Sequence, residues 1–201
     1  MDEKGIIKFR CNWEKVEPLP EEYIADINRW RDILYKKNLI GVDASGIGYG
    51  NISKRYNDNQ FIISGSATGN LALLSNEHYT VVTNFNIHQN LVDAKGPIIA
   101  SSESLTHAAL YQCDSSINAV IHIHSNALWK HLMRKVPTSN KSAEYGTPAM
   151  AKEIVRLYNN TNVRNTRILI MAGHEDGVMS FGPDIDAAGN VILNWLDSID
   201  K

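Results

Sequence analysis

The chain has 201 residues, of which 43% are hydrophobic and 21% are charged, and its formal net charge is -2 at pH 7. This length and composition favour one globular domain rather than two. A near-neutral charge without a basic stretch argues against nucleic acid as a partner. The two cysteines, Cys11 and Cys113, are too few for a disulfide scaffold or a cysteine-rich zinc cluster.

Membrane insertion and secretion are also disfavoured. No segment approaches the roughly 18 consecutive apolar residues of a spanning helix, and the first ten residues, MDEKGIIKFR, lack the apolar core of a signal peptide. We therefore expect a soluble, cytoplasmic protein with no membrane partner.

The first third of the chain begins with a predicted N-terminal extension, residues 1–20, ahead of a single domain at 21–201. The prolines and acids of PLPEE favour a helix start near Glu21. Apolar residues then recur at three- and four-residue steps from Ile24 to Leu34, so one stripe of this helix faces a core. Residues 41–69 contain short β-like pieces separated by glycines and serines.

The rest of the chain alternates between β and α signals. Strands are expected at 77–85, 86–98, 118–125 and 166–173, helices at 101–112 (with a serine cap), 126–135, 147–160 and 184–199, and a turn at 174–178. This mixed order predicts a central sheet covered by helices in one domain.

Two histidines, His122 and His124, lie two residues apart in the strand predicted at 118–125. Residues at this spacing point to the same face of a strand, so both imidazoles can reach one point. Imidazole suits Zn²⁺, and catalytic zinc sites commonly take three protein ligands. His174 follows the buried strand at 166–173 and is the candidate third ligand. Taken alone, the His-x-His pair fits a metal site and ordinary strand residues equally well.

Glu103, at the beginning of the helix predicted at 101–112, could reach a metal or act as a base beside it. The alternative is a helix cap, because Ser-x-x-Glu patterns and acids in a first turn often have that role. His107 lies on the same helical face and is interpreted as structural or as a support for the site.

Three segments, GYGNIS, SGSATG and ASSES, are rich in small and hydroxyl residues. Their N–H and O–H groups could hold a phosphate. Taken separately, each segment is better explained by turn formation.

In chain order, GNIS, SGSATG, SSE, HIHS and a late GH resemble the zinc-dependent class II aldolase and adducin-head family, over about Ile24 to Trp195. The resemblance implies a single three-layer α/β/α domain with a central, mainly antiparallel sheet, assembled as a homotetramer. It also implies Zn²⁺ as the cofactor, with another divalent transition metal as the alternative, and a small phosphorylated sugar as the substrate.

The same resemblance assigns roles residue by residue. It implies metal binding by His122, His124, His174 and Glu103, with Glu103 also the catalytic residue that moves a proton. It implies that the substrate phosphate is bound by Asn51, Thr68, Gly69, Ser101 and Ser102. The glutamate matches the family's aldolases and its dehydratase, whereas the 4-epimerases have an aspartate there.

We therefore expect a zinc-dependent lyase of the aldolase type that cleaves a small phosphorylated ketose through an enediolate. One alternative is a ketose-phosphate dehydratase that uses the same zinc and glutamate. The other is a non-catalytic binding domain like the adducin head, because a fold can persist without its chemistry.

The sequence departs from the family pattern at two places. No tyrosine matches the family's proton donor, since Tyr145 is assigned to the start of the next helix, and the possible substitutes are His131, Lys135 and Lys141. In addition, Glu175 and Asp176 separate His174 from the glycine that usually follows it. This insertion could supply a fourth carboxylate to the metal, or it could alter the turn that carries His174.

Overall fold

A computed structural model of the chain describes residues 7–199. The strands are β1 (Arg10–Lys15), β2 (Gly41–Val42), β3 (Gly48–Tyr49), β4 (Asn51–Asn57), β5 (Gln60–Ser64), β6 (Tyr79–Asn86), β7 (Leu91–Gly96), β8 (Ala119–His124), β9 (Ile168–Ile170) and β10 (Gly177–Gly182). The helices are α1 (Ala25–Lys36), α2 (Ser104–Cys113), α3 (Asn126–Leu132), α4 (Pro148–Asn160), α5 (Val163–Thr166) and α6 (Ile185–Ile199), with short 3-10 helices at Glu21–Tyr23 and Asn76–His78.

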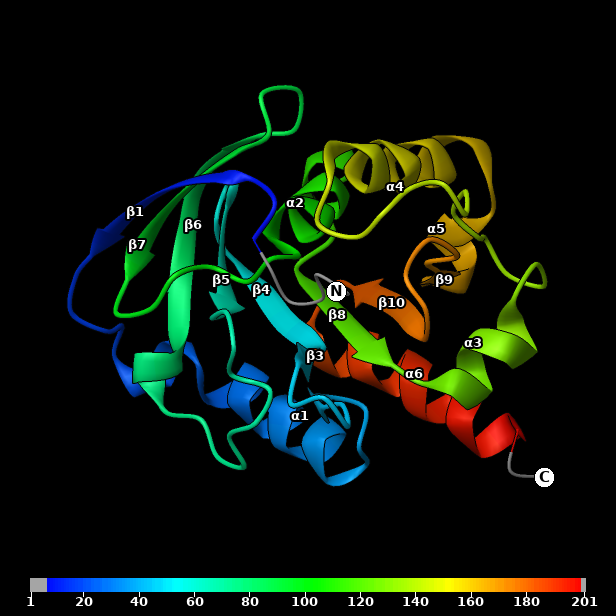
Figure 1. Cartoon of the computed structure of the whole chain (residues 1–201), viewed down its shortest axis with the longest axis horizontal. Coiled ribbons are helices and arrows are strands. Elements are labelled where there is room, and N and C mark those ends of the chain that lie inside the picture. Colours follow the sequence, from blue (N-terminus) through cyan, green and yellow to red (C-terminus); the bar gives the residue numbers. More distant parts are fainter. Residues whose placement is uncertain (1–6, 200–201) are drawn as a thin grey trace.

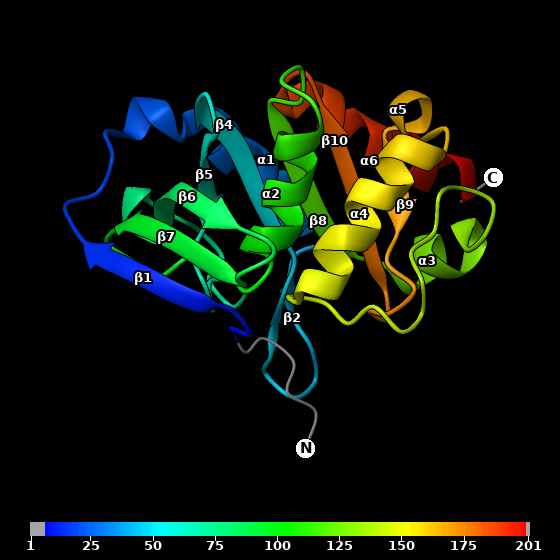
Figure 2. The same ribbon diagram turned by 90° about the horizontal axis from the view of Figure 1, so that it is seen from above.

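An eight-stranded sheet forms the middle layer, in the order β1-β7-β6-β5-β4-β8-β10-β9. Its neighbouring strands are antiparallel, except that β1 and β7 run parallel. Helices α2 and α4 lie on one side of the sheet and α1 and α6 on the other, as two perpendicular views show (Figures 1 and 2). The three-layer, mainly antiparallel fold expected from the sequence is confirmed.

The two faces of the sheet bury separate apolar clusters. Phe61 and Ile62 are adjacent on β5 but belong to different clusters, because successive side chains of a strand point to opposite faces. The Phe61 cluster includes Leu105 of α2, and the Ile62 cluster includes Ile27 of α1. Helices therefore cover the sheet on both faces.

Strand β8 occupies the interior of the sheet, between β4 and β10. Its β-branched residues Val120, Ile121 and Ile123 are fully buried, which agrees with the preference of such side chains for strands. The strand ends at His124, and the next residue, Ser125, caps α3 by accepting a hydrogen bond from the backbone N–H of Leu128. The cap therefore fixes the end of β8 at His124.

Local predictions near two elements differ from the structure. The helix expected to start near Glu21 begins as a 3-10 turn, and α1 itself starts at Ala25. Strand β10 was not predicted beyond the turn at 174–178, because GVMSFG has glycine at both ends and no alternating pattern. All six of its residues are buried between β8 and β9, so neighbouring strands rather than local propensity stabilise it.

The segment predicted as an N-terminal extension, residues 1–20, contributes an edge strand to the main sheet. Strand β1 pairs in parallel with β7, from Arg10 opposite Leu91 to Lys15 opposite Gly96. The domain boundary expected at residue 21 stays a prediction.

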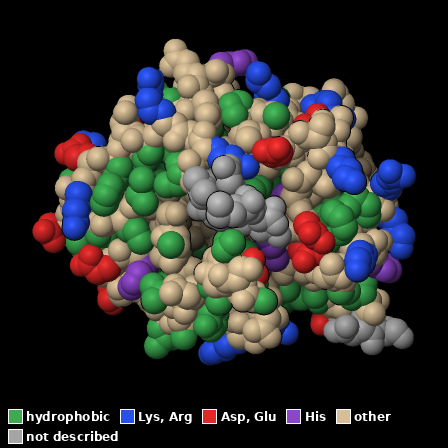
Figure 3. Space-filling model, viewed as in Figure 1, with side chains coloured by type: hydrophobic (Ala, Val, Ile, Leu, Met, Phe, Trp, Pro, Cys, Tyr) green, Lys and Arg blue, Asp and Glu red, His purple; other side chains and the backbone are tan. Residues whose placement is uncertain are grey.

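Charged side chains of both signs are interspersed over the face seen in Figure 3. Exposed ion pairs such as Lys95 with Glu14 contribute little to stability, at most about 1 kcal/mol. Among residues 7–199, no helix combines the length and apolar character needed to cross a membrane.

Candidate active site

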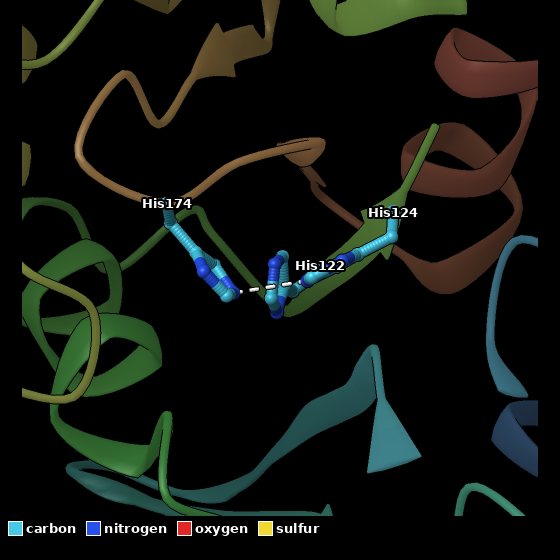
Figure 4. A group of neighbouring side chains, drawn as sticks. All are labelled: His122, His124 and His174. Carbon is cyan, nitrogen blue, oxygen red and sulfur yellow. Dashed lines mark hydrogen bonds between the residues drawn. The ribbon is translucent and has the colours of Figure 1, made fainter. Parts of the chain in front are cut away.

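His122, His124 and His174 point toward one another, two from β8 and one from the turn between β9 and β10 (Figure 4). One ligand atom of each histidine lies within 4.8 Å of those of the other two. The Nε2 atoms of His124 and His174 are 2.9 Å apart. The fold thus brings together three histidines that are separated by up to 52 positions in the chain.

The cluster fits a divalent metal ion. Nε2 of His122 is buried without a hydrogen-bond partner among residues 7–199, an arrangement that is unfavourable unless something binds that nitrogen. Burial, together with the neighbouring His124 and His174, keeps the pKa of His122 well below its ordinary value, so the ring is neutral and its lone pair is available. Three imidazole nitrogens are a donor set that Zn²⁺ and similar transition metals accept.

Asn51 on β4 supports His122 from the neighbouring strand. The two residues are directly opposite in the antiparallel register, and Nδ2 of Asn51 lies 3.5 Å from Nδ1 of His122. This predicted phosphate-binding residue therefore also contacts a predicted metal ligand.

Glu103 lies at the N-terminal end of α2 and is only 2% exposed. Its Oε2 accepts a hydrogen bond of 2.7 Å from Oγ1 of Thr106, and its Oε1 is 3.7 Å from Nε2 of His174. Burial raises the pKa of Glu103 to about 7, so both protonation states are accessible near neutral pH.

The alternative interpretation of Glu103 as a helix cap is confirmed for its position but not for its side chain. Glu103 occupies the N-cap position, but no side-chain capping bond to the described part of α2 is present there. The serine expected to cap the helix is not its N-cap residue, but the Ser101 hydroxyl accepts a hydrogen bond of 3.3 Å from the backbone N–H of Glu103 just before α2. The Glu103 carboxylate is left facing the histidines.

The histidines lie in a pocket of about 750 Å³, a volume suited to a small molecule. Every residue assigned to the site from the sequence lines this pocket: Asn51, Thr68, Gly69, Ser101, Ser102, Glu103, His122, His124 and His174. The hydroxyl-rich segments and the histidines, which come from different strands and loops, therefore share one cavity.

A buried arginine orients the loop that contains Thr68 and Gly69. Arg31 of α1 is 1% exposed, and its guanidinium donates to the carbonyls of Thr68 and Ala72 at 3.1 Å each. Because C=O and N–H point in opposite directions across a trans peptide plane, this bond turns the N–H of Gly69 away from Arg31. A side chain at position 69 would meet the carbonyl oxygen of Gly41 at 2.2 Å, so glycine is required there.

Two tyrosines that sequence reasoning did not place in the site also line the pocket. The ring of Tyr145 stacks on His174 with centroids 4.6 Å apart, and the ring of Tyr49 stacks on His124 at 5.1 Å. Tyr145 was expected at the start of a helix, but α4 begins only at Pro148, so that assignment is wrong. The glycine neighbours of both tyrosines, in GYG and EYG, were the only local signal that these segments are loops rather than helix.

The other candidates behave differently. The sequence offered three substitutes for the missing proton donor, namely His131, Lys135 and Lys141. None of the three is among the described residues that line the pocket. Glu175 and Asp176 do line it, but within residues 7–199 the compact group of metal-binding atoms consists of the three histidines alone. The inserted acids therefore supply no fourth ligand in this structure, and His174 still reaches the cluster.

The fold and the site together define a class, namely three-layer α/β proteins with a histidine cluster in a hydroxyl-rich pocket. Residues 42–195 match the family described as the Class II Aldolase and Adducin N-terminal domain. This match covers most of the chain, and the chain belongs to that family, as the motifs predicted. A search of proteins with curated functions found no match.

Several solved structures share the fold. An L-fuculose 1-phosphate aldolase superimposes with a TM-score of 0.68 and 18% identity, covering 90% of this chain and 84% of that chain. A sugar-phosphate aldolase from Thermotoga maritima has a TM-score of 0.65 and 13% identity, covering 89% of this chain and 92% of its own. An L-fuculose 1-phosphate aldolase from Glaciozyma antarctica PI12 has a TM-score of 0.60 and 15% identity, covering 89% of this chain and 71% of its own. At these identities the likeness shows the fold alone.

Proposed function

We propose that the protein is a metal-dependent lyase of the aldolase type that cleaves a small phosphorylated ketose. The observation that carries this proposal is the position of Glu103, buried and 3.7 Å from His174, in the pocket that also contains the hydroxyl-rich loops. Membership of the class II aldolase family supports an enzyme of this type. The names of two similar folds, a sugar-phosphate aldolase and an L-fuculose 1-phosphate aldolase, support the substrate class.

His122, His124 and His174 would hold the metal, and Zn²⁺ is the proposed ion because it accepts three imidazoles and leaves a position for substrate. The ion, when bound, polarises the carbonyl oxygen of the ketose and stabilises the negative charge that develops there. The carboxylate of Glu103 lies beside the cluster without completing it, so Glu103 is proposed as a base near the metal, with ligation as a secondary role.

Glu103 has the proton-transfer role in this mechanism. When the carbon–carbon bond breaks, the hydroxyl group on the far carbon gives its proton to the Glu103 carboxylate and becomes the carbonyl of the leaving aldehyde. The electron pair of the broken bond stays on the fragment that carries the carbonyl and the phosphate. Glu103 then delivers a proton to that fragment, and in the reverse direction removes it. A pKa of about 7 suits both directions at neutral pH.

The phosphate is proposed to bind at Asn51, Thr68, Gly69, Ser101 and Ser102. These residues offer amide, hydroxyl and backbone N–H donors rather than cations, and such donors bind phosphate through directed hydrogen bonds. Binding of the phosphate, away from the bond that breaks, positions the ketose against Glu103. The homotetramer and the cytoplasmic location expected from the sequence stay predictions.

The test combines metal analysis with product analysis. Untagged protein is analysed for transition metals and then assayed against a panel of ketose 1-phosphates. We expect close to one Zn²⁺ per chain, and an aldehyde plus a three-carbon ketose phosphate as products. A dehydrated diketone would replace the aldolase by a dehydratase at the same site. Folded protein that takes up no metal and converts no ketose phosphate would overturn the proposal in favour of a binding domain.

A further inference from the structure

The relative position of His124 and His174 depends on a turn. His124 is the last residue of β8, whereas His174 lies between β9 and β10, in the segment that contains the two inserted acids. The backbone of this turn is closed by hydrogen bonds from the N–H of His174 to Met171 and from the N–H of Gly177 to His174. These bonds shape the turn, but they do not connect it to β8.

The ladder between β8 and β10 joins the end of the turn to β8, with Gly177 opposite His124. Asp176 adds two further bonds. Its Oδ1 accepts a hydrogen bond of 2.7 Å from Nδ2 of Asn126, and its backbone carbonyl accepts one of 2.9 Å from the N–H of Ser125. Ser125 and Asn126 are the two residues that directly follow His124. One inserted acid is therefore bonded, through its side chain and its backbone, to the segment that carries the other metal-binding histidine.

The backbone at Asp176 shows that the turn is constrained. Its φ is 65°, in the left-handed region that residues other than glycine rarely adopt, although aspartate and asparagine tolerate it better than most. A side chain at Gly177 would come within 2.9 Å of Cδ2 of His174, so the chain passes close to the imidazole. A conformation of this kind persists only where surrounding bonds hold it.

We propose that Asn126 and Asp176 form a clamp that sets the distance between His124 and His174 and thereby raises the affinity of the site for its metal. The two are positioning residues and not ligands, since the Asp176 carboxylate is engaged by Asn126. The inference rests on the metal site of the proposed function. It also assigns a role to the insertion after His174, which holds the ligand in place rather than adding a carboxylate to the metal.

The test measures the dissociation constants of Zn²⁺ and Co²⁺ by competition with a chelator, with no substrate present. Asn126→Ala removes the donor, and we expect affinity to fall about tenfold, the lower end of the range for residues that orient metal ligands, because this bond is exposed. Asn126→Asp places a second carboxylate beside that of Asp176 and should lower the affinity for the metal at least as much. The control is Glu175→Gln, which neutralises the adjacent acid without touching the clamp and should leave affinity unchanged.

Two further variants separate the clamp from a simple charge effect. Asp176→Asn retains an acceptor oxygen and tolerates the positive φ, so it should bind metal within about threefold of the wild type. The double variant Asn126→Asp, Asp176→Asn reverses donor and acceptor and should recover most of the affinity that Asn126→Asp loses. The visible absorption of bound Co²⁺ should change in Asn126→Ala and return in the double variant.

The outcomes are distinct. A wild type that binds no metal contradicts the proposed function itself. A wild type that binds metal while Asn126→Ala binds equally well overturns the clamp alone. If Asp176→Asn loses as much affinity as Asn126→Ala and the double variant recovers nothing, the negative charge of Asp176 rather than the hydrogen bond is responsible, and the clamp is again overturned.

Discussion

Oε1 of Glu103 lies 3.7 Å from Nε2 of His174, and both side chains are buried. The two residues are 71 positions apart in the chain, one before α2 and the other between β9 and β10. Glu103 has its second oxygen bonded to Thr106, which holds the carboxyl group in one orientation. The pairing of an oriented carboxyl group with a histidine cluster is the feature on which the proposed chemistry depends.

Replacing Glu103 by Gln should separate catalysis from metal binding. The amide is nearly isosteric but cannot transfer the proton, and positioned acid–base groups typically contribute about 10²- to 10⁴-fold to the rate. We expect kcat with a ketose phosphate to fall by about that factor while Zn²⁺ content stays near that of the wild type. Unchanged turnover in Glu103→Gln would remove Glu103 from the mechanism, and loss of the metal would make it a ligand.

Removing the metal should destabilise the wild type but not a variant that lacks a ligand. A ligand present at 100 times its Kd stabilises the folded state by about 2.7 kcal/mol, so a chelator should lower the melting temperature of the wild type. His122→Ala should show little further change with chelator. The matched control is His131→Ala, which alters an exposed histidine outside the pocket and should respond as the wild type does. An identical chelator response in His122→Ala would argue against metal binding at this cluster.

Replacing Arg31 should weaken phosphate binding more than it slows the chemical step. Arg31→Met leaves the carbonyls of Thr68 and Ala72 without their buried donor, at an expected loss of about 1 to 3 kcal/mol in stability. The loop that orients the N–H of Gly69 is then less constrained. We expect KM for the ketose phosphate and the inhibition constant of inorganic phosphate to rise together, with a smaller change in kcat.

Two variants keep that result interpretable. Arg31→Lys retains the charge and one donor and should lie between Arg31→Met and the wild type. Arg29→Lys, two residues away on the exposed side of α1, should leave KM unchanged. A fall in kcat with KM unaltered would mean that Arg31 acts on the reacting end of the pocket instead.

His107 should make stability depend on pH. Burial lowers the pKa of His107 to about 3, whereas an unfolded histidine titrates near 6.5. Between these values the unfolded chain binds a proton that the folded chain excludes, so the free energy of unfolding falls as pH falls through this window. From pH 6.5 to pH 5 the loss is about 2 kcal/mol for this one group.

Urea denaturation of the metal-free protein at pH 7 and pH 5 measures this effect. The variant His107→Gln removes the titrating ring and should have a smaller decrease between the two pH values, even if its stability at pH 7 is lower. Nδ1 of His107 lies 2.7 Å from Oγ of Ser53, so some loss at pH 7 is expected. Equal pH dependence in wild type and variant would show that His107 is not the group responsible.

Periodicity and local chemistry allowed much of the fold to be predicted. The apolar stripe of α1 and the β-branched run of β8 were read correctly, because side-chain spacing reports directly which face of a helix or strand is buried. Strand β10 was not predicted, because the two flanking strands rather than its own sequence stabilise it. Tyr145 was misplaced because α4 begins only after its N-cap Thr147, whose hydroxyl accepts a hydrogen bond from the backbone N–H of Met150.

For the site, the sequence by itself determined that His122 and His124 share one face of a strand, because side chains two apart on a strand necessarily do so. It also determined the order of motifs by which the family was predicted. Only the tertiary structure decided that His174 and Glu103 meet these histidines, that Tyr49 and Tyr145 stack on two of the rings, and that Asp176 bonds to Asn126 instead of facing a metal. These contacts join residues from 29 positions apart, for Tyr145 and His174, to 75 positions apart, for Tyr49 and His124. Their distances depend on how turns and layers pack, which no local pattern in the chain specifies.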